Sequence, residues 1–222
     1  MNIKTVFFKG KFGRGVVDAL GAGTESRKEC HMDAFGWQIC EIHPGIGESD
    51  GMAVVLSGPD IGQLLKLEER MSGRTWLAAF PFERHIVVTP VFGLRRTCVR
   101  CFVRRWMSQP PEGYHPEVVS AIVTMVSTTP SFEYTNLSPL APDLSASAMA
   151  DSAARNASHA LCLDQAGEAV MSTTLRPLHG CVCRGKGDGD ASRFGRFDDA
   201  LHALVSRHLK APASEIDGEV TR

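Results

Sequence analysis

Two close pairs of cysteines are the residues of this chain best suited to chemistry. Cys98 and Cys101 stand in a Cys-x-x-Cys arrangement, and Cys181 and Cys183 form a second pair much later in the chain. Zn²⁺ prefers four soft ligands in a tetrahedron, and a short spacing lets both thiolates of a pair point the same way. The pattern predicts one zinc site. Four thiolates leave no open position for water, so the predicted zinc is structural and not catalytic.

The three other cysteines are Cys30, Cys40 and Cys162. We expect free thiols here, because a disulfide framework is rare in the reducing compartment where we place the chain. Cys30, His31, Cys40 and His43 also make a cluster of metal-ligand type. The stretch around Cys40 and His43 is typical of a strand, where residues three apart face opposite sides. A free core cysteine and a surface histidine are therefore the favoured interpretation.

Five arginines surround the first cysteine pair: Arg95, Arg96, Arg100, Arg104 and Arg105. We predict that they bind an acidic peptide leader or an acidic face of a partner protein. The alternative is a solvated helix face with some salt bridges. The net charge of −1 argues against a dedicated nucleic-acid binder, which carries a basic excess.

Length and composition set further limits. A chain of 222 residues can form one α/β domain, or one domain with a small lobe. The N-terminus has no apolar signal core, and no run approaches the ~20 apolar residues of a membrane span. We therefore expect a cytoplasmic protein without a membrane partner. No Ser/His/Asp or Cys/His spacing singles out a catalytic set, so no catalytic residue is predicted.

The order of the expected elements predicts an α/β fold with a mainly parallel sheet and a small zinc-stapled C-terminal lobe. Strands are expected over 3–8, 37–43, 52–57, 75–80 and 85–88, with a hairpin of 160–163 and 169–175. Helices are expected from the glycine turn at 10–15 to residue 20, and over 60–71, 98–106, 117–126, 144–160 and 197–209. We predict an α/β domain over 1–109, and over 110–222 a helical connector, the hairpin, the second cysteine pair and a last helix.

A glycine turn follows the first strand, with glycines at Gly10, Gly13 and Gly15. Strand, glycine turn and helix is how a nucleotide-binding βα unit begins, but these glycines lack the G-x-G-x-x-G order. The favoured interpretation is a turn that needs glycine for its geometry alone.

The run from Val54 to Trp106 carries a family resemblance. It joins a buried strand, Pro59-Asp60 with a Leu-rich helix, Trp76 to Phe80, Val91-Phe92-Gly93, and the first cysteine pair with Arg104-Arg105. This order resembles the E1-like (ThiF-fold) superfamily. Within it the chain is similar to the partner proteins of azole-forming peptide synthetases, the McbB and cyclodehydratase C-protein type. The hairpin and the lead-in Leu175 to Cys181 extend the resemblance to roughly residues 50–185.

The resemblance implies a function as well as a fold. Such proteins work beside a YcaO enzyme that uses ATP to cyclise Cys, Ser or Thr of a ribosomally made precursor peptide into azolines. The E1-like partner carries zinc, binds or presents the leader peptide and activates the YcaO subunit, usually without adenylating anything itself. A flavin dehydrogenase is a further expected partner, and a homodimer within the larger complex is the expected assembly.

This sequence departs from the family pattern in three places. Its second pair is Cys-x-Cys, which leaves His179 as an alternative fourth ligand. The chain starts directly with a strand, so no leader-recognition winged helix is expected before it. The glycines at 10–15 also differ from the nucleotide loop of active E1 enzymes.

Two rival functions belong to other classes. One is an adenylating enzyme that transfers AMP to a carboxylate, which requires a nucleotide loop with a nearby Arg and Asp. The other is a zinc knuckle that binds nucleic acid through the arginines, which the near-zero net charge disfavours.

Overall fold

A computed structural model describes residues 2–22, 29–42, 50–71, 73–93, 96–108, 114–129 and 132–175. The strands of this part are β1 (Asn2–Phe8), β2 (Glu29–Met32), β3 (Gln38–Glu41), β4 (Asp50–Val55), β5 (Trp76–Phe82), β6 (His85–Val88), β7 (His159–Leu163) and β8 (Ala169–Thr174). The helices are α1 (Gly10–Leu20), α2 (Ile61–Arg70), α3 (Val99–Ser108), α4 (Pro116–Thr128) and α5 (Ala141–Arg155). The helix expected over 197–209 lies outside the described residues.

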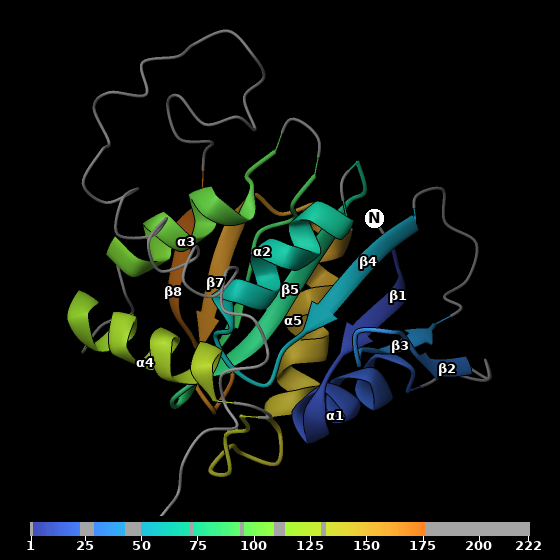
Figure 1. Ribbon diagram of the computed structural model, residues 1–222, viewed down its shortest axis with the longest axis horizontal. Helices are drawn as coiled ribbons and strands as arrows, with labels where there is room; N and C mark the ends of the chain where they lie inside the picture. Colours follow the sequence, from blue (N-terminus) through green and yellow to red (C-terminus); the bar gives the residue numbers. More distant parts are fainter. Residues whose placement is uncertain are drawn as a thin grey trace, which may run out of the picture.

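All eight strands join one mixed sheet in the order β2-β3-β1-β4-β5-β6-β7-β8 (Figure 1). β4 lies parallel to its neighbours β1 and β5. The five other pairings are antiparallel. The prediction of an α/β fold is confirmed, and the prediction of a mainly parallel sheet is wrong.

Short connections explain most of the antiparallel pairs. Only Glu83 and Arg84 separate β5 from β6, and Glu83 has a φ of 53°. A parallel partner needs a crossover of a dozen or more residues, so a link of two residues forces a hairpin. The link from β7 to β8 is also a tight turn, in which Asp164 Oδ1 accepts hydrogen bonds from Ala166 N and Glu168 N at 2.9 Å.

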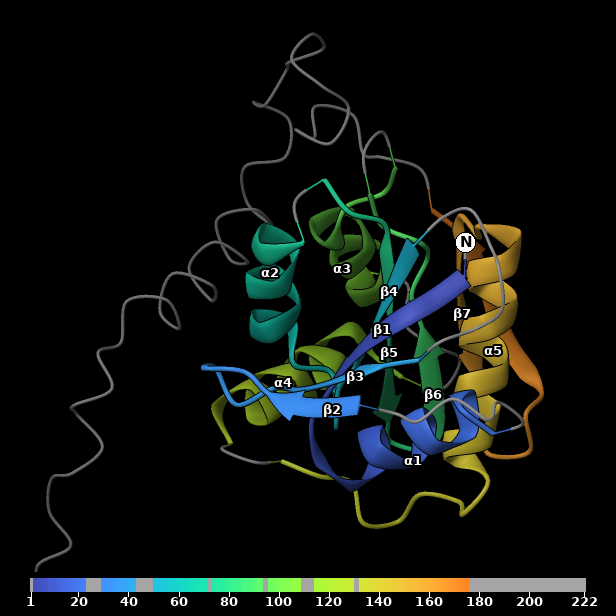
Figure 2. The same cartoon turned by 90° about the vertical axis from the view of Figure 1, so that its right-hand side faces the viewer.

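Helices cover both faces of the sheet. α2, α3 and α4 pack on one face, and α1 and α5 on the other (Figure 2). Alternate residues of the central strands supply the two cores, as with Val54 and Val55 of β4. The continuous apolar run of this strand follows from its burial on both faces.

The sheet continues past residue 109, because β7 pairs with β6. The division into domains at that point remains a prediction. No helix of the described part is long and apolar enough to cross a bilayer.

Candidate functional site

The first cysteine pair forms the beginning of α3. Phe102 N donates to Cys98 O at 3.1 Å, so the Cys98 carbonyl accepts a first hydrogen bond of the helix. Cys101 N donates to Cys98 Sγ at 3.5 Å, so the two cysteines share one turn. The sequence prediction of two thiols on one tight turn is confirmed at this pair. We call this turn, residues 97–101, the knuckle.

The apolar side of α3 fixes the orientation of the knuckle. Val99, Phe102, Val103 and Trp106 recur at helical spacing and are buried in the core against the sheet. Cys101 lies two positions from Val99, about 200° around the helix, so its side chain points away from that core. It is nevertheless only 1% exposed. The thiol therefore lies in a buried environment separate from the main core.

Glu68 of α2 holds the knuckle from the side. Its Oε1 accepts a hydrogen bond from Val99 N at 2.7 Å and so satisfies one of the open N–H groups at the start of α3. Burial raises the pKa of Glu68, and the hydrogen bond from Val99 N opposes that shift only in part. The contact links α2 to α3 and limits how the knuckle can move.

A buried hydrogen bond joins the knuckle to the end of β8. Thr97 Oγ1 donates to Leu175 O at 2.9 Å, across 78 positions of sequence. Leu175 N in turn donates to Ser158 O at 2.8 Å. Cys181 follows Leu175 by six residues, which span at most ~20 Å when extended. The fold thus brings Leu175, where the lead-in to the second cysteine pair begins, next to Thr97, which precedes the first pair.

Two of the four predicted zinc ligands, Cys181 and Cys183, lie outside the described residues, as does His179. Among the described residues no group of three or more metal-ligating side chains gathers. One pair alone does not make such a group, so the tetrathiolate site remains a prediction. The structure shows Cys98 and Cys101 on one turn, next to Leu175 at the end of β8.

The expectation of free thiols is wrong for Cys30 and Cys40, which form a disulfide. The two residues lie directly opposite each other in the β2–β3 ladder, with Cα atoms 4.1 Å apart. They occupy a non-hydrogen-bonded position, where facing side chains come closest. This pairing also removes both sulfurs from the second cluster considered for metal.

Cys162 is a free thiol, as expected. It is fully buried on β7, and burial raises the pKa of this thiol to about 12, with a smaller contribution from Asp164. A thiol with so high a pKa is protonated at neutral pH and is a poor nucleophile.

The predicted arginine surface is only partly described. Arg95 lies outside the described residues. Arg100 is exposed on α3, and Arg104 lies one turn further along with part of its side chain buried. Arg105 lies on another side of the helix, and Arg96 donates to Asn156 O at 3.5 Å. Arg100 and Arg104 therefore share one flank of α3, and partner binding by the five arginines remains a prediction.

The turn predicted at residues 10–15 is wrong, because Gly10, Gly13 and Gly15 lie within α1, but packing explains why they are glycines. Gly10 has a φ of 71°, which favours glycine. Cβ atoms at Gly13 and Gly15 would lie 2.8 Å from Phe8 Cβ and 2.9 Å from Pro142. These glycines therefore let α1 approach β1 and α5 closely, which confirms the geometric interpretation.

The start of α1 is occupied by a carboxylate of the protein itself. Glu133 Oε1 accepts a hydrogen bond from Lys11 N at 2.9 Å. A Cβ at Gly10 would overlap this carboxylate. In a nucleotide-binding βα unit a phosphate lies at the helix N-terminus. Here the Glu133 carboxylate accepts the hydrogen bond from Lys11 N that a phosphate would accept in such a unit.

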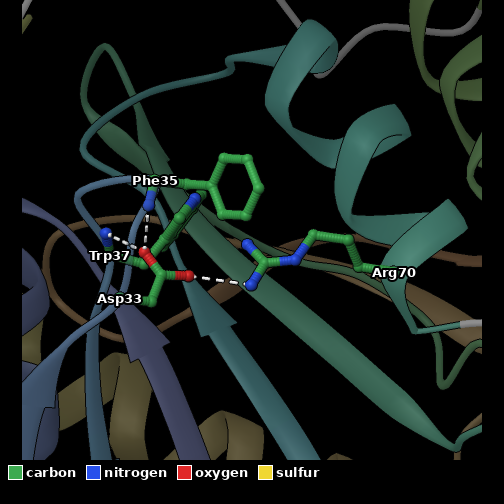
Figure 3. Close-up of polar contacts among 4 residues, drawn as sticks. All are labelled: Asp33, Phe35, Trp37 and Arg70. Carbon is green, nitrogen blue, oxygen red and sulfur yellow. Dashed lines mark hydrogen bonds and ion pairs between the residues drawn. The ribbon is translucent and has the colours of Figure 1, made fainter.

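A polar network that the sequence did not reveal fixes the β2–β3 hairpin (Figure 3). Asp33 Oδ1 accepts hydrogen bonds from Phe35 N at 2.9 Å and Trp37 N at 2.8 Å, and Oδ2 pairs with Arg70 at 2.8 Å. Burial alone would raise the pKa of Asp33, but these hydrogen bonds outweigh it and lower the pKa. Arg70 also lies over the Phe35 ring, 4.6 Å from its centroid. The only sequence signal was an Asp before a glycine-containing turn, typical of an Asx turn.

Comparisons with known proteins identify a fold. No family model matches the chain, and no curated protein matches its sequence. A solved heterocyclase in complex with substrate and cofactor aligns over 83% of this chain and 25% of its own, with 14% identity and a TM-score of 0.52. The heterocyclase TruD aligns over 80% and 26%, with 15% identity and a TM-score of 0.46. The E. coli microcin synthetase McbBCD complex aligns over 63% and 55%, with 9% identity and a TM-score of 0.46.

The first of these likenesses shows that the chain has a fold found within a heterocyclase. The chain spans about a quarter of the length of that heterocyclase chain.

Proposed function

We propose that this chain is a zinc-binding, E1-like scaffold and activator subunit of an ATP-dependent cyclodehydratase complex. The complex forms thiazoline and oxazoline rings from Cys, Ser and Thr residues of a ribosomally synthesised precursor peptide. The observation that carries the proposal is the fold shared with part of a heterocyclase, over 83% of this chain. The motif order from Val54 to Trp106 supports the E1-like assignment.

The proposed zinc ligands are Cys98, Cys101, Cys181 and Cys183. Zinc bound there would supply four strong thiolate bonds that tie α3 to the segment after β8. The hydrogen bond from Thr97 to Leu175 supports this proposal, because it already joins the same two parts of the chain. Glu68 supports it as well by holding Val99 N between the two thiols.

We place the ring-forming chemistry in a YcaO partner. This proposal is supported by the Glu133 carboxylate, which accepts a hydrogen bond at the start of α1, where a nucleotide phosphate would otherwise bind. Precursor peptide is the proposed substrate, and a flavin dehydrogenase would act on the rings afterwards. The flank of Arg100 and Arg104 is the proposed contact for an acidic leader or for the YcaO subunit.

Reconstitution tests the proposal. The chain, its YcaO partner, the precursor peptide and ATP with Mg²⁺ are combined, and mass spectrometry follows the loss of one water per ring. Omitting the chain should lower ring formation at least tenfold. Equal ring formation with and without the chain would contradict the activator role. ATP–pyrophosphate exchange by the chain alone would favour the adenylating enzyme instead.

Charge reversal on α3 sharpens the test. Arg100→Glu should lower ring formation while the fold is retained, because Arg100 is exposed and exposed charges contribute little to stability. Arg155→Glu is the matched control. Its exposed guanidinium pairs with Asp151 on α5, at the opposite face of the sheet.

A further inference from the structure

The disulfide of the β2–β3 hairpin joins two cysteines that differ in their access to solvent. Cys30 lies on β2, the last strand at one end of the sheet, and is exposed. Cys40 lies on β3, between β2 and β1, and is fully buried in the core on the α1 side of the sheet. Small molecules in solution therefore have access to Cys30 and not to Cys40.

Arg14 of α1, the helix next to the hairpin in Figure 2, places a positive charge beside Cys30. Its Nη1 lies 3.8 Å from Cys30 Sγ. Two further contacts hold the guanidinium there, because Nη2 donates to Gln38 Oε1 at 2.8 Å and the group lies 4.9 Å from the centroid of the Phe8 ring. A guanidinium beside a thiol favours the thiolate, which is the form that reacts with oxidants and disulfides. Once the disulfide is opened, Cys30 is therefore the activated thiol of the pair.

Cys40 is in position to react with an oxidised Cys30. The two residues face each other in the ladder, and β3 is fixed on both sides, by β2 and by β1. The hairpin loop is fixed as well, because the Asp33 carboxylate accepts a hydrogen bond from Trp37 N and pairs with Arg70. Opening of the disulfide therefore leaves the two sulfurs as neighbours, which join again without a rearrangement of the sheet.

We propose that Cys30 and Cys40 form a reversible thiol pair that reduces hydroperoxides. The Cys30 thiolate attacks one peroxide oxygen, so that an S–O bond forms as the O–O bond breaks. The other oxygen leaves with a proton as an alcohol or as water, and Cys30 becomes a sulfenic acid. The Cys40 thiol then attacks the Cys30 sulfur, the S–S bond forms and water leaves. Two electrons thus pass from the two thiols to the peroxide.

A small-molecule thiol, such as glutathione, returns the pair to its dithiol form. Its thiolate attacks the exposed Cys30 sulfur, and Cys40 leaves and takes up a proton. A second molecule of the thiol attacks the small-molecule sulfur of this mixed disulfide, and Cys30 leaves as the thiolate that Arg14 stabilises. In the reducing compartment predicted from the sequence, disulfides are mostly catalytic or redox-sensing. This inference rests on the hairpin alone, and not on the peptide chemistry proposed above.

Trypsin gives a direct readout of the pair, because the peptide of residues 29–66 holds Cys30 and Cys40 and no other cysteine. The full chain is reduced, freed of reductant and mixed with hydrogen peroxide, and mass spectrometry follows the disulfide in this peptide. The wild type should form it at least about threefold faster than Arg14→Ala, because a larger thiolate fraction outweighs a weaker nucleophile. Arg155→Ala removes an exposed arginine of α5 and is the matched control, which should react as fast as the wild type. Equal rates for the wild type and Arg14→Ala would overturn the proposal.

Single-cysteine variants identify the reacting thiol. In Cys40→Ser, peroxide with dimedone should label Cys30, because its sulfenic acid then has no thiol to react with. In Cys30→Ser, Cys40 should stay unlabelled because it is buried. Labelling of Cys40, or of neither cysteine, would overturn the assignment. The peptide is read separately from the predicted zinc ligands, so a failure here is distinct from a failure of zinc binding or of ring formation.

Discussion

The β2–β3 hairpin and the knuckle each bring two cysteines together, by different means. Cys30 and Cys40 are ten residues apart and meet because the hairpin places them opposite each other. Cys98 and Cys101 are three residues apart and meet within one turn at the start of a helix. The first pair closes on itself as a disulfide, whereas the second follows Thr97, which donates a hydrogen bond to Leu175 O at the end of β8. The short sequence spacing of Cys98 and Cys101 predicted that they lie together. The ten residues between Cys30 and Cys40 gave no sign of their disulfide.

The largest expected difference between the two cysteine pairs is in the zinc content of their variants. Cys98→Ala should lose about one zinc per chain and lower the free energy of unfolding by more than about 4 kcal/mol, because a structural metal is lost. Elemental analysis and urea unfolding measure the two effects. Cys30→Ala should keep its zinc. A wild-type protein without zinc would contradict the tetrathiolate proposal.

Removing the disulfide should have a smaller effect, confined to one edge of the sheet. Cys30→Ala with Cys40→Ala should lower the free energy of unfolding by about 3 kcal/mol, the entropy of a loop of this length. Urea unfolding measures the loss, and zinc content should stay the same. A change in zinc content would mean that the two regions are coupled, contrary to the comparison.

The hydrogen bond from Thr97 of the knuckle to Leu175 O can be removed by a substitution that keeps the shape of the side chain. Thr97→Val leaves the buried carbonyl of Leu175 without its donor and should cost about 2 kcal/mol of stability. Thr128→Val is the control, because its hydroxyl is exposed on α4. Equal stability of both variants in urea would show that Thr97 does not join the two segments.

The hairpin network should give the smallest effect, one that depends on pH. The folded-state pKa of Asp33 lies below its ordinary value of 3.8. Its contribution to stability is therefore full above 3.8 and is lost as pH falls through the lowered pKa. Asp33→Asn should be less stable than the wild type at neutral pH, and the gap should narrow in strong acid. Urea unfolding across that range measures the gap, and a constant gap would contradict the assignment.

Local patterns predicted the elements well. The helix from Ile61 was expected from its leucines and from Asp60, whose Oδ1 accepts a hydrogen bond from Gln63 N at 3.0 Å. The strand over 85–88 and the hairpin around Asp164 to Gly167 also lie where the sequence predicted them. β2 was not expected, because four residues are too few for an alternating pattern to show.

The pairing between strands was harder to predict from the sequence than the elements themselves. The mainly parallel sheet was predicted from the alternation of element types, but the link of Glu83 and Arg84 is too short for a crossover. That signal was present in the sequence. The antiparallel pairing of β6 with β7 had no such signal, because some seventy residues separate the two strands and their pairing depends on how α3, α4 and α5 pack.

The sequence by itself determined most of the strands and helices, though not β2, and also that the glycines of α1 serve geometry and that Cys98 and Cys101 share a turn. These features depend on residues a few positions apart, whose side-chain spacing and backbone preferences act locally. Only the tertiary structure decided that Cys30 meets Cys40, that Glu133 fills the start of α1, and that Thr97 lies against Leu175. Each of those contacts joins residues from separate elements, and the shared sheet and its two cores determine where those elements lie.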